Sequence, residues 1–348
     1  MTQLNTPYPA TAYLTGFLKL HAERLDLEVV QTDAAIELFL RVFSRSGLER
    51  VHHELAQRAG ETDEELPPSI AHFLAHAEAY EGTVDAVVRF LQGRDPGLAL
   101  RIVGRELLPE GPRFHAIASD GDDDPLAWAF GGLGVSDRAK HLASLYIDDV
   151  ADVIRDGIAA DFELSRYGER LAASAPTFDP LQGALEGEPT LIDTILDELA
   201  AELQARHRPD VIGLTAPFPG NIYGAFRIAR MIKALSPGTR AILGGGYVNT
   251  ELRELSDPRV FDYFDFITVD DGEAPMLALV EHLSDPARPL LRTFVRRNGR
   301  VVLQNDSTLH DIPIAQAGTP TYVGLPLDRY LSLFEMLKIG RASCRERV

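Results

Sequence analysis

The chain has 348 residues, of which 45% are hydrophobic and 25% are charged, enough for one large or two ordinary domains with a buried core. Disordered and fibrous classes are therefore excluded. Because 34 lysine and arginine residues stand against 52 aspartate and glutamate residues, the net charge of −18 would repel phosphate backbones and anionic lipid headgroups. We expect no nucleic acid and no membrane as partner. No run approaches about 18 apolar residues, and the first residues lack the pattern of a secretory leader, which predicts a cytoplasmic protein.

The sequence contains a single cysteine, Cys344. One cysteine excludes an internal disulfide and any metal site built from several thiolates. Residues 339–348 (IGRASCRERV) read as the translation of a common sequencing adapter, so they are excluded from fold reasoning. We expect the natural sequence to depart from this one after about Lys338, and a downstream domain to be missing.

The first 45 residues are predicted to form two strand–helix units of a parallel sheet. Residues 2–6 are strand-like, and Pro7 and Pro9 separate them from an apolar helix. Residues 27–31 (LEVVQ) predict a second buried strand, followed by a helix for which Thr32 or Asp33 is the candidate N-cap.

Residues 46–206 change to helical periodicity interrupted by polar loops, which predicts a large helical insertion. Thr190 is expected to begin one of its helices, because Asp193 stands at the capping-box position and apolar residues follow at helical spacing. The acidic run at residues 120–124 predicts a solvated loop, since it lacks the fixed glycine and distal glutamate of a calcium loop.

Regular alternation returns over residues 207–290, where three further strand–helix units are expected. Their strands are predicted at residues 210–215, 240–243 and 264–269. Residues 291–304 then predict a β-hairpin that turns at Asn298-Gly299, and residues 305–338 a linker. The expected fold is α/β, with a doubly wound parallel sheet of about five strands, a helical insertion and a terminal hairpin.

Open parallel sheets bind ligands beyond the carboxyl ends of their strands. Three consecutive glycines, Gly244, Gly245 and Gly246, follow the strand predicted at residues 240–243. They either admit a bulky ligand close to the backbone or form a tight turn with positive φ. No G-x-G-x-x-G follows the first strand, and no P-loop or G-x-S-x-G motif occurs, so dinucleotide, triphosphate and serine-hydrolase chemistry are not predicted.

Four segments of the sequence are together similar to one protein family. They are NTPYPATAYLTGFL (residues 5–18), DVIGLTAPFPGN (210–221), AILGGGYVNTELREL (241–255) and FDFITVDDGEAP (264–275). They resemble the N-terminal cobalamin-binding domain of B12-dependent radical S-adenosylmethionine enzymes, and the resemblance covers most of residues 1–290. It implies a flavodoxin-like sheet, with the corrin over the carboxyl ends of the strands and its dimethylbenzimidazole tail beside the glycine loop.

The resemblance also implies which residues contact cobalamin. The three glycines match the family's G-G element, and residues 215–217 (TAP) occupy the slot usually written S-x-[LT], from which Pro217 departs. The implied cofactor-binding residues are Asn5, Thr6, Pro7, Tyr8, Thr215, Ala216, Pro217, Gly220, Asn221, Gly244, Gly245, Gly246, Tyr247, Asp270, Gly272 and Glu273.

The first loop predicts how cobalt would be held. Cobalamin mutases and methionine synthase carry D-x-H-x-x-G there, whereas residues 5–9 of this chain read NTPYP. If cobalamin binds, we therefore expect no protein histidine as lower ligand of cobalt. Tyr8 or Tyr13 is a candidate to cover that face, with a packed loop tyrosine as the alternative.

The family's cluster motif, C-x-x-x-C-x-x-C, is missing from this chain. The [4Fe–4S] cluster and S-adenosylmethionine are therefore expected only in the missing downstream domain of a methyltransferase or related radical enzyme. The chain itself is expected to bind cobalamin without catalysis, and no catalytic residue or metal ligand is predicted in it. The alternatives are a flavodoxin-like scaffold or interaction domain that has lost the corrin and, disfavoured by the proline-rich first loop, a flavin domain.

Overall fold

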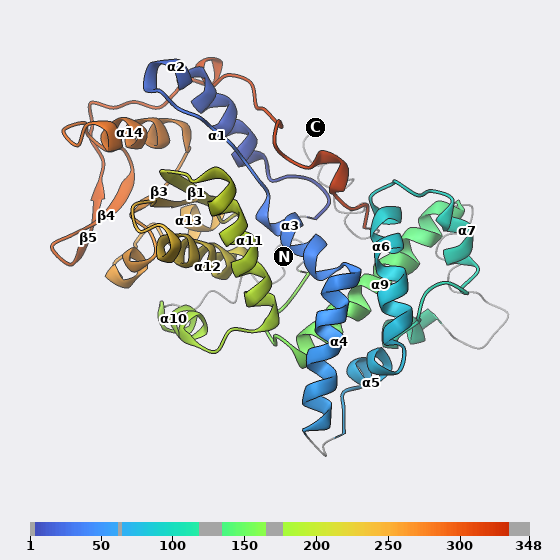
Figure 1. Cartoon of the computed structure of the whole chain (residues 1–348). Helices are drawn as coiled ribbons and strands as arrows, with labels where there is room; N and C mark the ends of the chain where they lie inside the picture. Colours follow the sequence, from blue (N-terminus) through green and yellow to red (C-terminus); the bar gives the residue numbers. More distant parts are fainter. Residues whose placement is uncertain (1–3, 62–64, 118–133, 165–176, 334–348) are drawn as a thin grey trace.

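The computed structural model describes residues 4–61, 65–117, 134–164 and 177–333. A sheet with its covering helices forms one end of the molecule, and a larger group of helices forms the other (Figure 1). The fold is therefore α/β, as predicted. The acidic loop at residues 120–124, Cys344 and residues 339–348 lie outside the described residues.

Five strands form one mixed sheet in the order β1-β2-β3-β4-β5. The strands are β1 (Val211–Thr215), β2 (Arg240–Gly244), β3 (Phe266–Thr268), β4 (Thr293–Arg297) and β5 (Arg300–Gln304). The first three are parallel, whereas β4 runs antiparallel to β3 and β5 antiparallel to β4. The hairpin turns at Asn298 and Gly299, whose φ angles are 50° and 75°, as an Asn-Gly turn requires. These three parallel strands and the hairpin confirm their predictions.

The two strands predicted near the N-terminus are not part of this sheet. Residues 4–6 form a turn and a bend, and residues 27–31 are extended but belong to no strand. Half-buried and exposed residues alternate along residues 27–31, which explains their strand-like pattern. The Nε2 group of Gln31 donates hydrogen bonds to the carbonyl oxygens of Thr321 (2.7 Å) and Val323 (3.0 Å). The prediction of about five parallel strands is therefore wrong. Alternating exposure shows that one side of a segment is buried, but it does not identify the segment that covers that side.

Helices cover both faces of the sheet. The core on one face receives residues from α10 (Asp179–Glu186), α12 (Pro219–Leu235), α13 (Gly246–Glu251) and the 3-10 helix η3 (Pro258–Asp262). On the other face lies α14 (Glu273–Ser284). Along β2, Ala241 and Leu243 belong to the first core, whereas Ile242 packs with Leu279 of α14. Burial on both faces explains why the parallel strands are continuous apolar runs in the sequence.

The helical end has a core of its own. Its helices are α3 (Ala34–Val42), α4 (Arg45–Gly60), α5 (Pro68–Ala75), α6 (Ala77–Leu91), α7 (Leu98–Val103), η1 (Pro112–Ile117), α9 (Val135–Gly157) and α11 (Leu191–His207). The described part of residues 46–206 is thus largely helical, as predicted. α3, which the sequence placed in the second strand–helix unit, buries Ile36, Phe39 and Val42 in this helical core.

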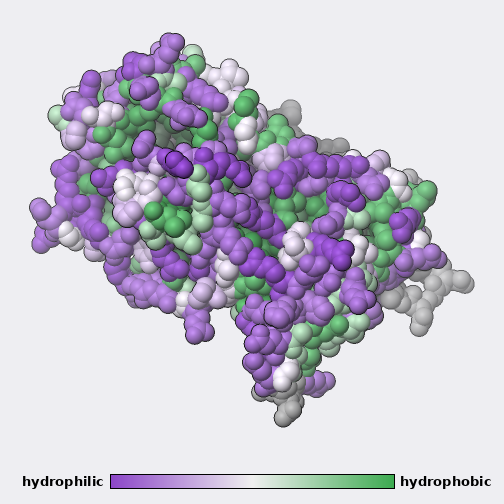
Figure 2. Space-filling model, in the orientation of Figure 1, coloured by the Kyte–Doolittle hydropathy of each residue, from purple (hydrophilic) through white to green (hydrophobic). Residues whose placement is uncertain are grey.

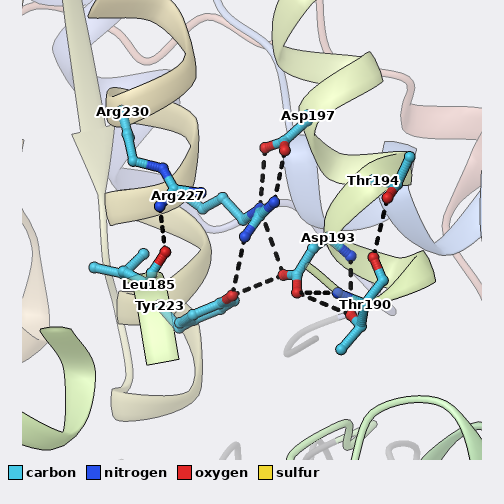
Figure 3. Close-up of polar contacts among 8 residues, drawn as sticks. All are labelled: Leu185, Thr190, Asp193, Thr194, Asp197, Tyr223, Arg227 and Arg230. Carbon is cyan, nitrogen blue, oxygen red and sulfur yellow. Dashed lines mark hydrogen bonds and ion pairs between the residues drawn. The ribbon is translucent and has the colours of Figure 1, made fainter. Parts of the chain in front are cut away.

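A buried polar network joins α11 to α12 (Figure 3). The guanidinium of Arg227 is 2% exposed and donates to both carboxylate oxygens of Asp197, at 2.6 and 3.0 Å. Arg227 also donates to the hydroxyl of Tyr223 (3.3 Å), which in turn donates to Asp193 (2.8 Å). Asp193 and Thr190 form the predicted capping box at the start of α11.

The two ends of the described chain lie along one another. α1 (Pro9–Leu20) packs against α14, and the short α2 (Ala22–Leu25) follows it. Residues 305–333, with the 3-10 helices η4 (Ile314–Gln316) and η5 (Leu327–Arg329), return past α1 towards the helical end (Figure 1). Hydrophilic side chains predominate on the face seen in Figure 2, with smaller apolar patches between them. Within the described residues, no helix combines the length and apolar character needed to cross a lipid bilayer.

Candidate ligand-binding site at the strand ends

The loops after β1 and β2 meet at the carboxyl edge of the sheet. Thr215 pairs with Gly244 in the parallel register. Beyond this pair, the amide of Ala216 donates to the carbonyl oxygen of Gly244 (2.9 Å), and the amide of Tyr247 donates back to the carbonyl oxygen of Ala216 (3.1 Å). Backbone hydrogen bonds thus join the segments that follow β1 and β2.

The glycine loop packs against the chain itself. Gly245 has φ 109° and ψ −178°, a conformation essentially restricted to glycine. A Cβ at Gly245 would lie 2.7 Å from the carbonyl oxygen of Ala216, and one at Gly246 would lie 2.7 Å from that of Pro217. At Gly244 it would lie 3.1 Å from the Thr268 hydroxyl oxygen. Close packing against the chain thus accounts for glycine at these three positions, and the positive φ of the predicted tight turn is found at Gly245 alone.

The loop after β3 is tied to the helix that follows the glycines. The side chain of Asn249 accepts from the amide of Asp270 (2.8 Å) and donates to its carbonyl oxygen (3.4 Å). These bonds hold Asp270 with φ 66°. Asp270 also forms an ion pair with Arg253, and Arg292 Nε lies 3.9 Å from Asp270 Oδ2. The charge of Asp270 is thus offset on two sides.

Sequence reasoning missed Asn249, Arg253 and Arg292. Asn249 and Arg253 lie within a segment that carries the resemblance, but their spacing is that of ordinary exposed helix residues. Arg292 precedes β4 with φ 43°, and no pattern in the sequence places it beside the loop after β3.

The N-terminal segment covers part of this edge. The ring of Tyr8 contacts that of Phe218 edge-to-face, with 6.1 Å between ring centroids. A Cβ at Gly246 would lie 3.7 Å from the Tyr8 hydroxyl oxygen, and one at Gly272 would lie 3.0 Å from a methyl carbon of Leu14. The structure therefore brings Tyr8 and Gly272 to the predicted site, together with Phe218 and Leu14, which were not predicted.

The other predicted residues differ in how they are placed. Thr215 is half-buried, and its hydroxyl has no hydrogen-bond partner in the described part of the chain. Glu273 is half-buried at the first position of α14. Gly220 and Asn221 lie in the first turn of α12, where the amide of Asn221 donates to the carbonyl oxygen of Phe218 (3.0 Å). The preceding residues differ in exposure: half-buried Pro7, exposed Asn5 and exposed Thr6.

The edge gathers polar side chains, among them Thr215, Tyr247 and Glu273, around the packed glycine loop. Within the described ranges, no group of three or more histidine, cysteine, aspartate or glutamate residues is placed to hold a metal ion. The polar side chains at the edge can bind a ligand through hydrogen bonds.

Two surface hollows lie away from this edge. One is lined by Ser46, Glu49, Arg50, His53, Glu54, Gln57 and Leu191. The other, near the amino ends of β1 and β2, is lined by Gln204, Ala205, Arg208, Pro209, Asp210, Leu235, Ser236, Gly238 and Thr239. Neither includes a residue predicted to bind a cofactor.

In comparisons with protein-family models and with curated proteins, no family model matches the chain and no curated protein matches it.

Proposed function

We propose that the chain is the cobalamin-binding module of a B12-dependent radical S-adenosylmethionine enzyme and that its sheet is of the flavodoxin-like kind. One observation carries the proposal. The first of the four segments with the resemblance lies far from the other three in the sequence, yet contacts bring residues of all four to one edge of the sheet: Tyr8, Ala216, Tyr247 and Asp270. This edge is where open α/β sheets bind their ligands.

The residues at the edge are compatible with a corrin in three respects. The hydroxyl of Thr215 is half-buried and free to hydrogen-bond, as a contact to the cofactor's tail requires. The resemblance aligns residues 5–9 (NTPYP) with the loop that carries a histidine in cobalamin mutases, so no imidazole from these residues would ligate cobalt. Tyr247 and Glu273 add polar groups at the ends of β2 and β3. Bound cobalamin would supply a cobalt centre that carries a methyl group or exchanges electrons.

The rest of the enzyme belongs to the proposal as well. The [4Fe–4S] cluster and S-adenosylmethionine would be held by a downstream domain, the natural partner of this module, because the chain has no motif for the cluster. The acidic charge of the chain favours neither nucleic acid nor membrane partners, and we place the module in the cytoplasm.

The proposal is tested by anaerobic reconstitution of the chain with hydroxocobalamin, desalting and an ultraviolet–visible spectrum. Thr215→Val keeps the shape of the side chain and removes its hydroxyl, so we expect corrin affinity to fall about fivefold, the effect of one hydrogen bond. Thr194→Val is the matched control, since the Thr194 hydroxyl donates only to the carbonyl oxygen of Thr190 on the surface of α11. Near-stoichiometric corrin in the wild type and control, with weaker retention in Thr215→Val, supports the module.

A scaffold or interaction domain without corrin is the second candidate. It is favoured by the glycine loop, because the space that a Cβ would take at Gly245 and Gly246 is filled by Ala216 and Pro217 rather than left open. Absence of retained corrin in the wild-type chain would overturn the cobalamin proposal in favour of this candidate. Equal retention by the wild type and Thr215→Val would remove Thr215 from the binding site.

A further inference from the structure

The C-terminal segment runs along the N-terminal segment and contacts it repeatedly. We use "strap" for residues 319–332 and "cover" for residues 4–16. The amide of Thr321 donates to the carbonyl oxygen of Ala12 (3.0 Å), and the amide of Leu331 donates to that of Leu4 (2.8 Å). Gly16 lies so close to the strap that a Cβ there would overlap the carbonyl oxygen of Thr319.

The strap is anchored on the helical end as well. The hydroxyl of Tyr330 donates to Asp33 (2.7 Å), the residue that caps α3, and Arg329 pairs with Glu37 one turn later (2.8 Å). The amide of Ser332 donates to the carbonyl oxygen of Leu91 at the end of α6 (2.7 Å). These contacts fix the strap to the helical core.

Gln31 ties the middle of the strap to the segment after α2. Its Nε2 group donates to two strap carbonyl oxygens, those of Thr321 and Val323, as described above. Its Oε1 atom is buried without a hydrogen-bond partner in the described part of the chain. The side chain of Gln31 therefore binds the strap only through its amide nitrogen.

The cover contacts the strand ends at Tyr8, between its two hydrogen bonds to the strap, and at Leu14, between Ala12 and the close approach of Gly16 to the strap. Leu4 and Ala12 accept the strap's hydrogen bonds, Tyr8 between them reaches Phe218 and Gly246, and Leu14 reaches Gly272. The cover therefore cannot leave the strand ends without breaking its hydrogen bonds to the strap. We infer that the strap is a latch that holds the cover over the strand ends and thereby controls access to the ligand site proposed there.

The contacts between the strap and the cover do not depend on which ligand binds. The control of access to the ligand site, in contrast, rests on the proposed function. The test uses Gln31→Glu in the full chain, a change of nearly equal size that replaces the donor with a carboxylate facing two carbonyl oxygens. Gln57→Glu makes the same change on the exposed surface of α4 and is the control. Amide hydrogen exchange followed by mass spectrometry measures how fast the backbone amides of the strap and of the cover exchange, and it needs no bound ligand.

We expect Gln31→Glu to exchange about tenfold faster than wild type in the strap and also in the cover, with β1 to β3 and α9 unchanged. Lowering the pH to about 4 protonates the introduced carboxyl, restores one donor and returns part of the protection. Gln57→Glu should match wild type. Faster exchange in the strap alone would overturn the latch, because the cover would then be held by the strand ends. A loss of protection throughout the sheet would also overturn it, since the strap would then be part of the core.

A second variant disturbs the contact between the cover and the strap by a substitution in the cover. Gly16→Ala places a methyl group against Thr319, whereas Gly82→Ala on α6 meets no atom within 4 Å and is the control. Gly16→Ala should reproduce the exchange pattern of Gln31→Glu. If the wild type binds hydroxocobalamin, both variants should also bind it faster than their controls, and an unchanged association rate would overturn the role in access. If the wild type does not bind hydroxocobalamin, the exchange data still show whether the strap holds the cover in place.

Discussion

Asp149 is a buried carboxyl group whose titration should be visible in the stability of the protein. It lies on α9, is 2% exposed, and accepts hydrogen bonds from the amides of Arg113 (2.8 Å) and Gly111 (3.1 Å). Burial raises its pKa to about 6, although both amides oppose the shift. The native state therefore holds a proton that the unfolded chain has already lost between about pH 4 and pH 6.

The stabilisation from this proton is complete below about pH 4 and is lost as the pH rises through about 6. Relative to Asp149→Asn, which does not titrate, the wild type should lose up to about 3 kcal/mol of unfolding free energy between these limits. Urea unfolding of both proteins over this pH range measures the difference. Parallel stability curves for the two proteins would show that the carboxyl does not titrate in this way.

Gly245 should be intolerant of any side chain because its backbone conformation and its surroundings both exclude one. With φ at 109° and Ala216 at contact distance, Gly245→Ala should destabilise the protein by about 2 kcal/mol or more. Gly238→Ala, at the opposite edge of the sheet and with no atom near the added methyl, should change stability by less than about 1 kcal/mol. Thermal unfolding of both variants compares them, and equal effects would contradict the role of the φ angle.

At the scale of elements, the buried ion pair of Arg227 with Asp197 links α12 to α11. Arg227→Met would leave the carboxylates of Asp193 and Asp197 without the cation that they share (Figure 3), and we expect a loss of about 3–5 kcal/mol of unfolding free energy. The control is Arg50→Met, which removes an exposed ion pair to Glu198 on the same α11 and should cost less than about 1 kcal/mol. Denaturant unfolding measures both, and a small effect of Arg227→Met would mean that the carboxylates are solvated or protonated without it.

Elements whose signals are local were predicted well from the sequence. The capping box of Thr190 and Asp193 involves residues three apart, and the turn at Asn298 and Gly299 follows from their tolerance of positive φ. Residues 27–31 had an equally regular pattern, yet they form no strand. The last of them, Gln31, is bonded to the strap, which is far away in the sequence, and no property of LEVVQ identifies this partner.

At the scale of the whole molecule, two cores are joined by α11, α12 and β1. Ile212 and Leu214 of β1 pack against both the helical core and the core on one face of the sheet. The strap and the cover add a second connection, because Leu4 and Leu331 bind each other by a backbone hydrogen bond and both are buried in or against the helical core. The strand ends are thus held between elements from both ends of the chain.

The candidate site was predicted in part. The strand-end rule and the resemblance selected Ala216, the glycines, Tyr8 and Asp270, and the structure brings these residues together. Asn249 and Leu14 were not predicted, because each sits at an ordinary helical position and matters only through a neighbour from another segment. Whether a corrin binds among them stays a prediction.

The sequence by itself determined the α/β class, the three parallel strands, the hairpin and the helical character of the middle of the chain. These follow from hydrophobic periodicity, caps and turn residues, whose physical causes act over a few residues. Only the tertiary structure decided that residues 4–6 and 27–31 form no strand, that the glycine loop packs on Ala216 and Pro217, and that the strap runs along the cover. Each of these depends on contacts between distant segments, whose energies depend on complementary shape and hydrogen bonding that neither segment carries alone.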